Sequence, residues 1–70
     1  MGSLRLGSVT SYEAERGLGL IAGPDGSEHL FHCTAIADGS RQIEVGEQVA
    51  FLLLAAHGGR YEASQVTKLT

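Results

Sequence analysis

Short segments in which apolar and polar residues alternate are separated by turn-forming residues along the whole chain. The segments cover about residues 4–12, 17–22, 29–33, 48–56 and 60–68, and the stretches between them are rich in Gly, Pro and Asp. Alternation with a period of two is typical of β-strands, whose successive side chains point to opposite faces. We therefore predict an all-β fold with five strands, closed into a small antiparallel barrel.

The alternation assigns residues of the second and third segments to faces. Leu18 and Leu20 share one face of the second strand, and Gly19 lies on the other. Leu30 and His32 share one face of the third strand. Because glycine is unfavourable inside a strand, we expect the glycines of "RGLGLI" to allow a ligand or partner to approach closely.

The fourth segment is apolar on both faces. Val49, Phe51 and Leu53 fall on one side, and Ala50, Leu52 and Leu54 fall on the other. The outer face of a small antiparallel barrel is usually polar. Exposed apolar surface of this kind marks association, so the outer leucines predict a contact with another chain.

Composition indicates one globular domain over residues 1–70. The chain is 43% hydrophobic and 19% charged, and no apolar run is long enough to span a bilayer. The start "MGSLRL" has no signal-peptide core, and the single cysteine, Cys33, excludes an internal disulfide. We therefore expect a cytoplasmic protein without a membrane partner.

Charge alone does not indicate a nucleic-acid partner. Five Lys and Arg residues face eight Asp and Glu residues, which gives a formal net charge of −3. This balance argues against a broad phosphate-binding surface, although a local basic edge is compatible with it.

The sequence contains no constellation typical of an enzyme or a cofactor site. "GLGLIAG" does not match the dinucleotide-binding motif, and no phosphate-binding loop is present. A zinc site needs about four ligands, but alternation places His32 opposite His29 and Cys33, and His57 lies far along the chain. We expect no catalysis, no metal and no cofactor, and we interpret Cys33 as a small buried hydrophobic residue.

Four stretches resemble the bacterial cold-shock proteins and related cold-shock domains. "GSVTSYEAERGLGLI" is similar to that family's first strand and its glycine-alternating ribonucleoprotein motif, and "DGSEHLFHCTAI" is similar to the second motif. "VGEQVAFLL" and "ASQVTKL" resemble the last two strands. The resemblance covers about residues 5–68 and implies an OB-type barrel that binds single-stranded RNA and DNA.

The family binds bases by stacking them on aromatic side chains, and most of these are replaced here. The family's first-strand Lys-Trp-Phe corresponds to Thr10, Ser11 and Tyr12. Its ring positions on the next two strands and in the following loop correspond to Leu18, Leu20, Leu30, Cys33 and Ser40, while its histidine is kept as His32. We call Leu18, Leu20 and Leu30 the leucine face. Basic positions are better preserved, at Arg16 and near Arg41.

Two hypotheses follow from the replaced rings. In the first, the chain binds single-stranded RNA or DNA weakly and with little sequence selectivity. Its predicted contact residues are Tyr12, Arg16, Leu18, Leu20, Leu30, His32, Arg41 and Arg60. In the second, nucleic-acid binding is lost, and the barrel self-associates or binds a protein through the leucine face or through Leu52 and Leu54.

Overall fold

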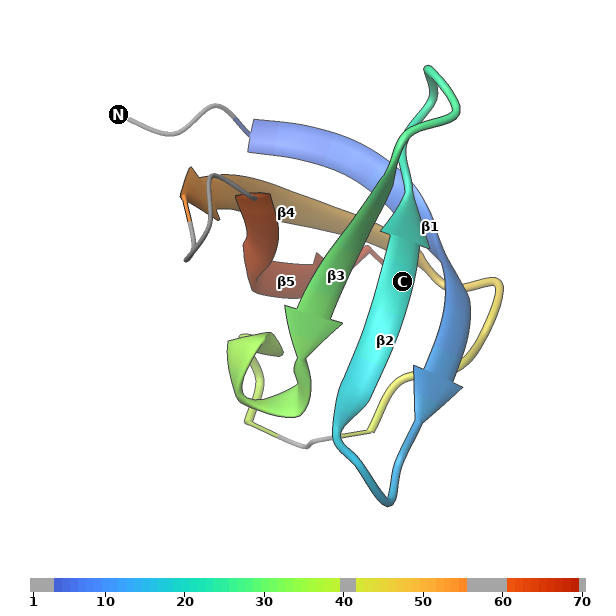
Figure 1. Cartoon of the computed structure of the whole chain (residues 1–70), viewed down its shortest axis with the longest axis vertical. Helices are drawn as coiled ribbons and strands as arrows, with labels where there is room; N and C mark the ends of the chain where they lie inside the picture. The colour runs from blue at the N-terminus through green and yellow to red at the C-terminus, as the bar shows by residue number, and fades with distance from the viewer. Residues whose placement is uncertain (1–3, 40–41, 56–60, 70) are drawn as a thin grey trace.

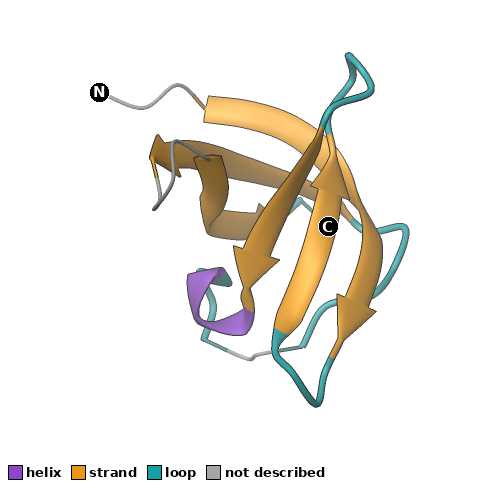
Figure 2. Cartoon of the chain, in the orientation of Figure 1, coloured by secondary structure: helices purple, strands orange, loops and turns teal. Residues whose placement is uncertain are grey.

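The computed structural model describes residues 4–39, 42–55 and 61–69, and within these ranges five strands close into a barrel (Figure 1). They are β1 (Leu4–Glu13), β2 (Leu18–Ala22), β3 (Glu28–His32), β4 (Gln48–Ala55) and β5 (Tyr61–Lys68). A single 3-10 turn, η1 (Cys33–Ala35), follows β3 in the described chain (Figure 2). The predicted five-stranded barrel is confirmed. In the described ranges, no helix has the length and apolar character that a membrane span requires.

The strands follow the order β1-β2-β3-β5-β4 around the barrel, and β4 pairs with β1 to close it. The pairings of β1 with β2, β2 with β3, β4 with β5 and β1 with β4 are antiparallel, as predicted. The β3–β5 pairing is parallel, with Leu30 opposite Glu62, so the prediction of a fully antiparallel barrel is wrong at this one seam. β1 is antiparallel to β2 and to β4. β3 and β5, which are antiparallel to β2 and β4 respectively, therefore both run in the direction of β1.

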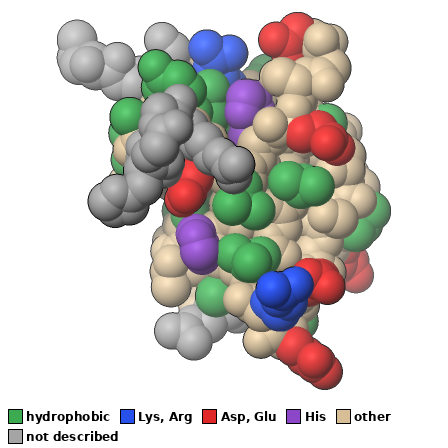
Figure 3. Space-filling model, in the orientation of Figure 1, with side chains coloured by type: hydrophobic (Ala, Val, Ile, Leu, Met, Phe, Trp, Pro, Cys, Tyr) green, Lys and Arg blue, Asp and Glu red, His purple; other side chains and the backbone are tan. Residues whose placement is uncertain are grey.

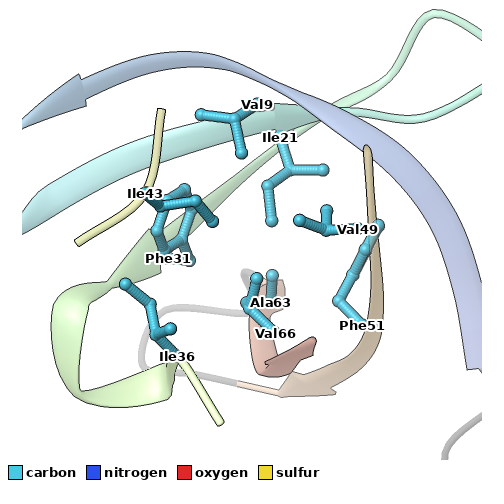
Figure 4. Close-up of a cluster of buried hydrophobic side chains, with 9 residues drawn as sticks. All are labelled: Val9, Ile21, Phe31, Ile36, Ile43, Val49, Phe51, Ala63 and Val66. Atoms are coloured by element: carbon cyan, nitrogen blue, oxygen red, sulfur yellow. The ribbon is translucent and has the colours of Figure 1, made fainter. Parts of the chain in front are cut away.

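Apolar side chains from every strand fill the barrel interior (Figure 4). The buried cluster consists of Val9, Ile21, Phe31, Ile36, Ile43, Val49, Phe51, Ala63 and Val66. Leu53 is half-buried against this cluster, which confirms the predicted inner face of β4. The prediction that Ala50 lies on the outer face is wrong, because Ala50 is buried where the register of β4 against β5 shifts. Burial of these side chains is the main favourable contribution to folding.

The glycines of "RGLGLI" make room for the barrel's own residues. Gly19 is buried, and a Cβ built on it would lie 2.6 Å from two carbons of the Phe31 ring and 2.7 Å from the Ser11 carbonyl oxygen. Gly17 is also buried, has a φ of +67° and would place a Cβ 2.8 Å from Cys33 Sγ. Packing inside the barrel therefore explains both glycines, and the approach of an external partner to them stays a prediction.

Candidate nucleic-acid interface

The leucine face is built by the antiparallel register of β2 and β3. Leu20 lies directly opposite Leu30, and Leu18 lies directly opposite His32. Directly paired residues share a face of the sheet. The three leucines are half-buried and His32 is exposed, as alternation predicted. Figure 3 shows hydrophobic side chains gathered on this side of the molecule, with charged side chains and a histidine around them.

β1 continues this surface with polar groups. Ser11 pairs with Leu20 and Glu13 pairs with Leu18. The register of β1 shifts between Val9 and Ser11, which is the irregularity that a β-bulge produces. Ser11, Glu13, Gly19 and the leucine face line an open hollow of ≈ 420 Å³. The floor of this hollow is therefore aliphatic, and its β1 edge carries a hydroxyl and a carboxylate.

Tyr12 does not lie with the leucine face. It pairs with Gly19 and packs against the buried cluster, where its ring stacks on Phe31 with centroids 5.9 Å apart and planes 4° from parallel. One side of the Tyr12 ring is thus occupied inside the barrel. Its role in contacting a base stays a prediction, and the contact would have to use the part of the side chain that remains accessible.

Two basic side chains beside the leucine face, Arg16 and His32, lie next to carboxylates. Arg16 Nη1 is 3.7 Å from Glu13 Oε2, and His32 Nε2 is 3.9 Å from Glu62 Oε1. Exposed pairs of this kind contribute at most about 1 kcal/mol to stability. These pairs also affect a ligand, because a phosphate that approaches either basic side chain also meets a negative charge. Arg41 and Arg60, which were predicted as contact residues, lie outside the described residues.

Glu62 belongs to this surface although it is not among the contact residues predicted from the sequence. It pairs with Leu30 across the parallel seam and with Leu54 across the β4–β5 hairpin. The leucine face is therefore joined to Leu54 through a carboxylate. His32, Glu62 and Leu54 contribute to a hollow of ≈ 330 Å³, whose other lining residues are Thr34, Ala35, Ala55, Ala63 and Ser64. Alternation beside the inward-facing Ala63 could have placed Glu62 outside, but nothing local indicates its neighbour on β3.

The outer side of β4 also carries the apolar residues that the sequence predicted. Leu52 lies directly opposite Leu4 of β1, and Leu6 lies opposite Ala50. Leu4 is 69% exposed, Leu6 is 58% exposed, and Leu52 is half-buried. An aliphatic stripe therefore runs along the outside of the β1–β4 pair.

A separate polar cluster lies where β2 turns into β3. The Ser27 hydroxyl lies 2.6 Å from Asp25 Oδ1 and 3.0 Å from His29 Nε2. Because that hydroxyl has one proton, which it donates to the carboxylate, His29 Nε2 must be the donor in the second bond. The hydrogen bond from Ser27 is the main reason that the pKa of Asp25 lies below its ordinary value of 3.8. The ring of His29 lies 5.6 Å from that of Phe51, on the opposite face of β3 from His32.

Comparisons with known proteins agree with this geometry. Residues 5–69 match the model of the 'Cold-shock' DNA-binding domain. The chain is 38% identical over 64 residues to the cold shock-like protein CspC of Bacillus cereus, covering 90% of this chain and 97% of that protein. It is 37% identical over 49 residues to cold shock protein 1 of Lactiplantibacillus plantarum, covering 69% of this chain and 74% of the relative.

A solved structure confirms the fold. The structure titled drosophila Unr CSD456 superposes with a TM-score of 0.81 at 23% identity, and the match covers 97% of this chain and 27% of that one. At this identity the likeness concerns the fold alone. The family model spans nearly the whole barrel, including the strands that carry the leucine face. The chain therefore belongs to the cold-shock domain family, which is generally nucleic-acid binding.

Proposed function

We propose that this chain binds single-stranded RNA or DNA weakly and with little base selectivity, through the leucine face and the neighbouring Arg16 and His32. The observation that carries the proposal is the outward display of Leu18, Leu20, Leu30 and His32 on adjacent strands of a cold-shock barrel. The surface has the place and the histidine that the family resemblance implies. It differs in offering alkyl groups where flat rings are expected.

The low affinity follows from the loss of stacking. An aromatic side chain under a base contributes about 1–3 kcal/mol. Replacing four or five rings by Leu, Ser and Cys removes on the order of 5 kcal/mol, even when the remaining contact of a leucine with a base is counted. At about 1.4 kcal/mol per factor of ten, this weakens binding by several orders of magnitude relative to a surface with its rings.

The low selectivity follows from the chemistry of the same surface. Branched alkyl groups contact every base alike, and discrimination between bases needs hydrogen bonds to their edges. Among the described residues near the leucine face, the side chains that can supply such bonds are few: Ser11, Glu13, Arg16, His32 and Glu62. The same surface predicts a weak dependence of binding on salt. If about three phosphates are contacted, the logarithm of the binding constant should fall with the logarithm of the salt concentration with a slope near −2.

The test is a fluorescence-anisotropy titration of a labelled oligo-pyrimidine at low salt. It compares the parent chain with a variant that carries Leu18→Phe, Leu20→Phe and Leu30→Phe. We expect measurable binding by the parent and binding at least tenfold tighter by the variant. Binding by the variant alone would show that the parent has lost the function. Binding by neither chain would refute the assignment of this face, and tight, salt-resistant binding by the parent would refute the stacking argument.

A second candidate function is self-association through the aliphatic stripe on β1 and β4. The observation that favours it is the direct pairing of Leu4 with Leu52 on the outer side of the barrel, next to the exposed Leu6. Size-exclusion chromatography with light scattering tests it. A monomer at high protein concentration would exclude this candidate and would leave nucleic-acid binding unaffected.

A further inference from the structure

Glu62 places a carboxylate within the surface over which a bound strand would lie. We propose that this carboxylate limits the affinity of the leucine face for single-stranded nucleic acid, by competing with phosphate for His32 and by repelling the backbone. The inference rests on the proposed function, since it names the residue that sets the strength of that binding.

The position of Glu62 is fixed by strand pairing and not by a mobile loop. It lies opposite Leu30 of β3 on one side and opposite Leu54 of β4 on the other. Its side chain is 36% exposed, and Oε1 lies 3.9 Å from His32 Nε2. The carboxylate therefore faces solvent from between two leucines, directly beside the histidine.

The neighbouring apolar groups increase the effect of this charge. The attraction or repulsion between two charges grows as the surrounding medium becomes less polar, and both strand partners of Glu62, Leu30 and Leu54, are apolar. A phosphate that hydrogen-bonds to His32 would lie within a few ångströms of Glu62. The gain from the imidazole is then offset by repulsion from the carboxylate.

Glu62 differs in this respect from the other carboxylate at the face. Glu13 lies at the outer edge of the hollow, 64% exposed, and its neighbour Arg16 carries a full positive charge. Its charge is therefore compensated at any pH near neutrality. The partner of Glu62 is a histidine, which is charged only when protonated. Glu62 is thus the negative charge of this surface that its neighbour compensates least.

The test measures binding of the labelled oligo-pyrimidine to the parent and to Glu62→Gln, which keeps the shape of the side chain and removes its charge. We expect the dissociation constant to fall about three- to tenfold at low salt, equivalent to about 0.7–1.4 kcal/mol. The difference between the two chains should shrink as salt is raised to about 1 M, where the Debye length is about 3 Å. Urea denaturation of both chains confirms that the comparison is between folded proteins.

Glu44→Gln is the matched control, because it changes the net charge of the chain by the same amount. Glu44 lies in the loop before β4, where Gly46 and Glu47 form backbone hydrogen bonds with Val9 of β1. β1 and β2 therefore separate this loop from His32. An equal rise in affinity for Glu44→Gln and Glu62→Gln would overturn the inference, since net charge alone would then explain both.

The remaining outcomes separate the inference from the proposed function. If the parent binds and Glu62→Gln binds equally well, the inference is wrong and the function stands. If only Glu62→Gln binds, the inference is supported, and the carboxylate has abolished the function in the parent. If neither binds, both are wrong. A rise for Glu62→Gln that persists unchanged at about 1 M salt would also overturn the inference, because a charge effect must be screened.

Discussion

Replacing Gly19 by alanine tests why glycine occurs in the middle of β2. The added methyl would lie 2.6 Å from Cε1 and Cζ of Phe31 and 2.7 Å from the backbone oxygen of Ser11. The φ of Gly19 is not positive, so alanine would meet no backbone strain at this position. In an open position, such a substitution would stabilise the chain by about 0.4–1 kcal/mol through the unfolded state. At Gly19 the steric contacts reverse the sign.

The magnitude follows from the atoms that the methyl would meet. Overpacking in a core costs about 1–3 kcal/mol. The oxygen of Ser11 belongs to a paired strand and cannot rotate away, and the ring of Phe31 is fully buried. We therefore expect a loss near the upper end, about 3 kcal/mol. A chain of 70 residues has a total stability of roughly 4–10 kcal/mol, so the midpoint of thermal unfolding should fall by at least about 12 °C.

Urea denaturation followed by far-UV circular dichroism measures the effect, with Gly23→Ala as the control. Gly23 also lacks a positive φ, and a methyl there would meet only the ends of the Asp25 and Ser27 side chains among its close neighbours, at 3.2 Å. We expect Gly23→Ala to change the free energy of unfolding by less than about 1 kcal/mol. If Gly19→Ala is as stable as the parent but binds an oligonucleotide less tightly, the packing argument is refuted and Gly19 is a ligand-approach position.

Two further predictions concern the polar cluster and the core. Ser27→Ala removes the principal hydrogen bond to Asp25, so the pKa of Asp25, measured by NMR titration, should rise toward its ordinary value of 3.8. Because the pKa of Asp25 is lower in the folded chain, the ionised Asp25 carboxylate stabilises the fold above its unfolded pKa, and this stabilisation is lost as the pH falls through the folded pKa. The Ser27→Ala variant should therefore lose less stability than the parent over that acidic range. Ile21→Val removes one methylene from a fully buried side chain and should lower the free energy of unfolding by about 0.5–1.5 kcal/mol in urea.

The strand faces of β2 and β3 could be predicted from the sequence because alternation is a local property. Leu18 and Leu20 are two residues apart, and no irregularity separates them, so any strand through these positions puts both on one side. The same holds for Leu30 and His32. The existence of the leucine face therefore follows from residues that are close in the chain.

The face of Tyr12 could not be predicted by the same alternation, because β1 carries one extra residue before it. Strict alternation from the buried Val9 would place Ser11 inside the barrel and Tyr12 outside. The register shift between Val9 and Ser11 reverses this phase, so Ser11 lies beside Leu20 and Tyr12 stacks on Phe31. In the sequence the bulge appears only as the odd spacing between Val9 and Tyr12, and alternation alone predicts from that spacing that Tyr12 points outward.

The contact of Glu62 with the leucine face could not be predicted because it depends on two pairings that are distant in sequence. Leu30 and Glu62 meet only because the β4–β5 hairpin folds back along β3 in the parallel direction. The need for glycine at position 19 could not be predicted from its neighbours in the chain either, because it depends on where the Phe31 ring packs. Local patterns thus predict which residues share a strand face. Which charged side chains lie beside that face can be known only from the three-dimensional structure of the barrel.

The inner side of the β2–β3 pair contributes to stability, and the outer side is the proposed binding surface. The triple phenylalanine variant is informative because it changes only the outer side. Phe31 and Ile21 fill the inner side and are fully buried, while the leucine face lies on the outer side and is half-buried. Substitutions on the outer side therefore add atoms toward solvent and leave the core cluster unchanged, so they are expected to alter stability little. A gain in oligonucleotide affinity by the triple phenylalanine variant then reports on stacking, because the barrel that presents the rings is the same in both chains.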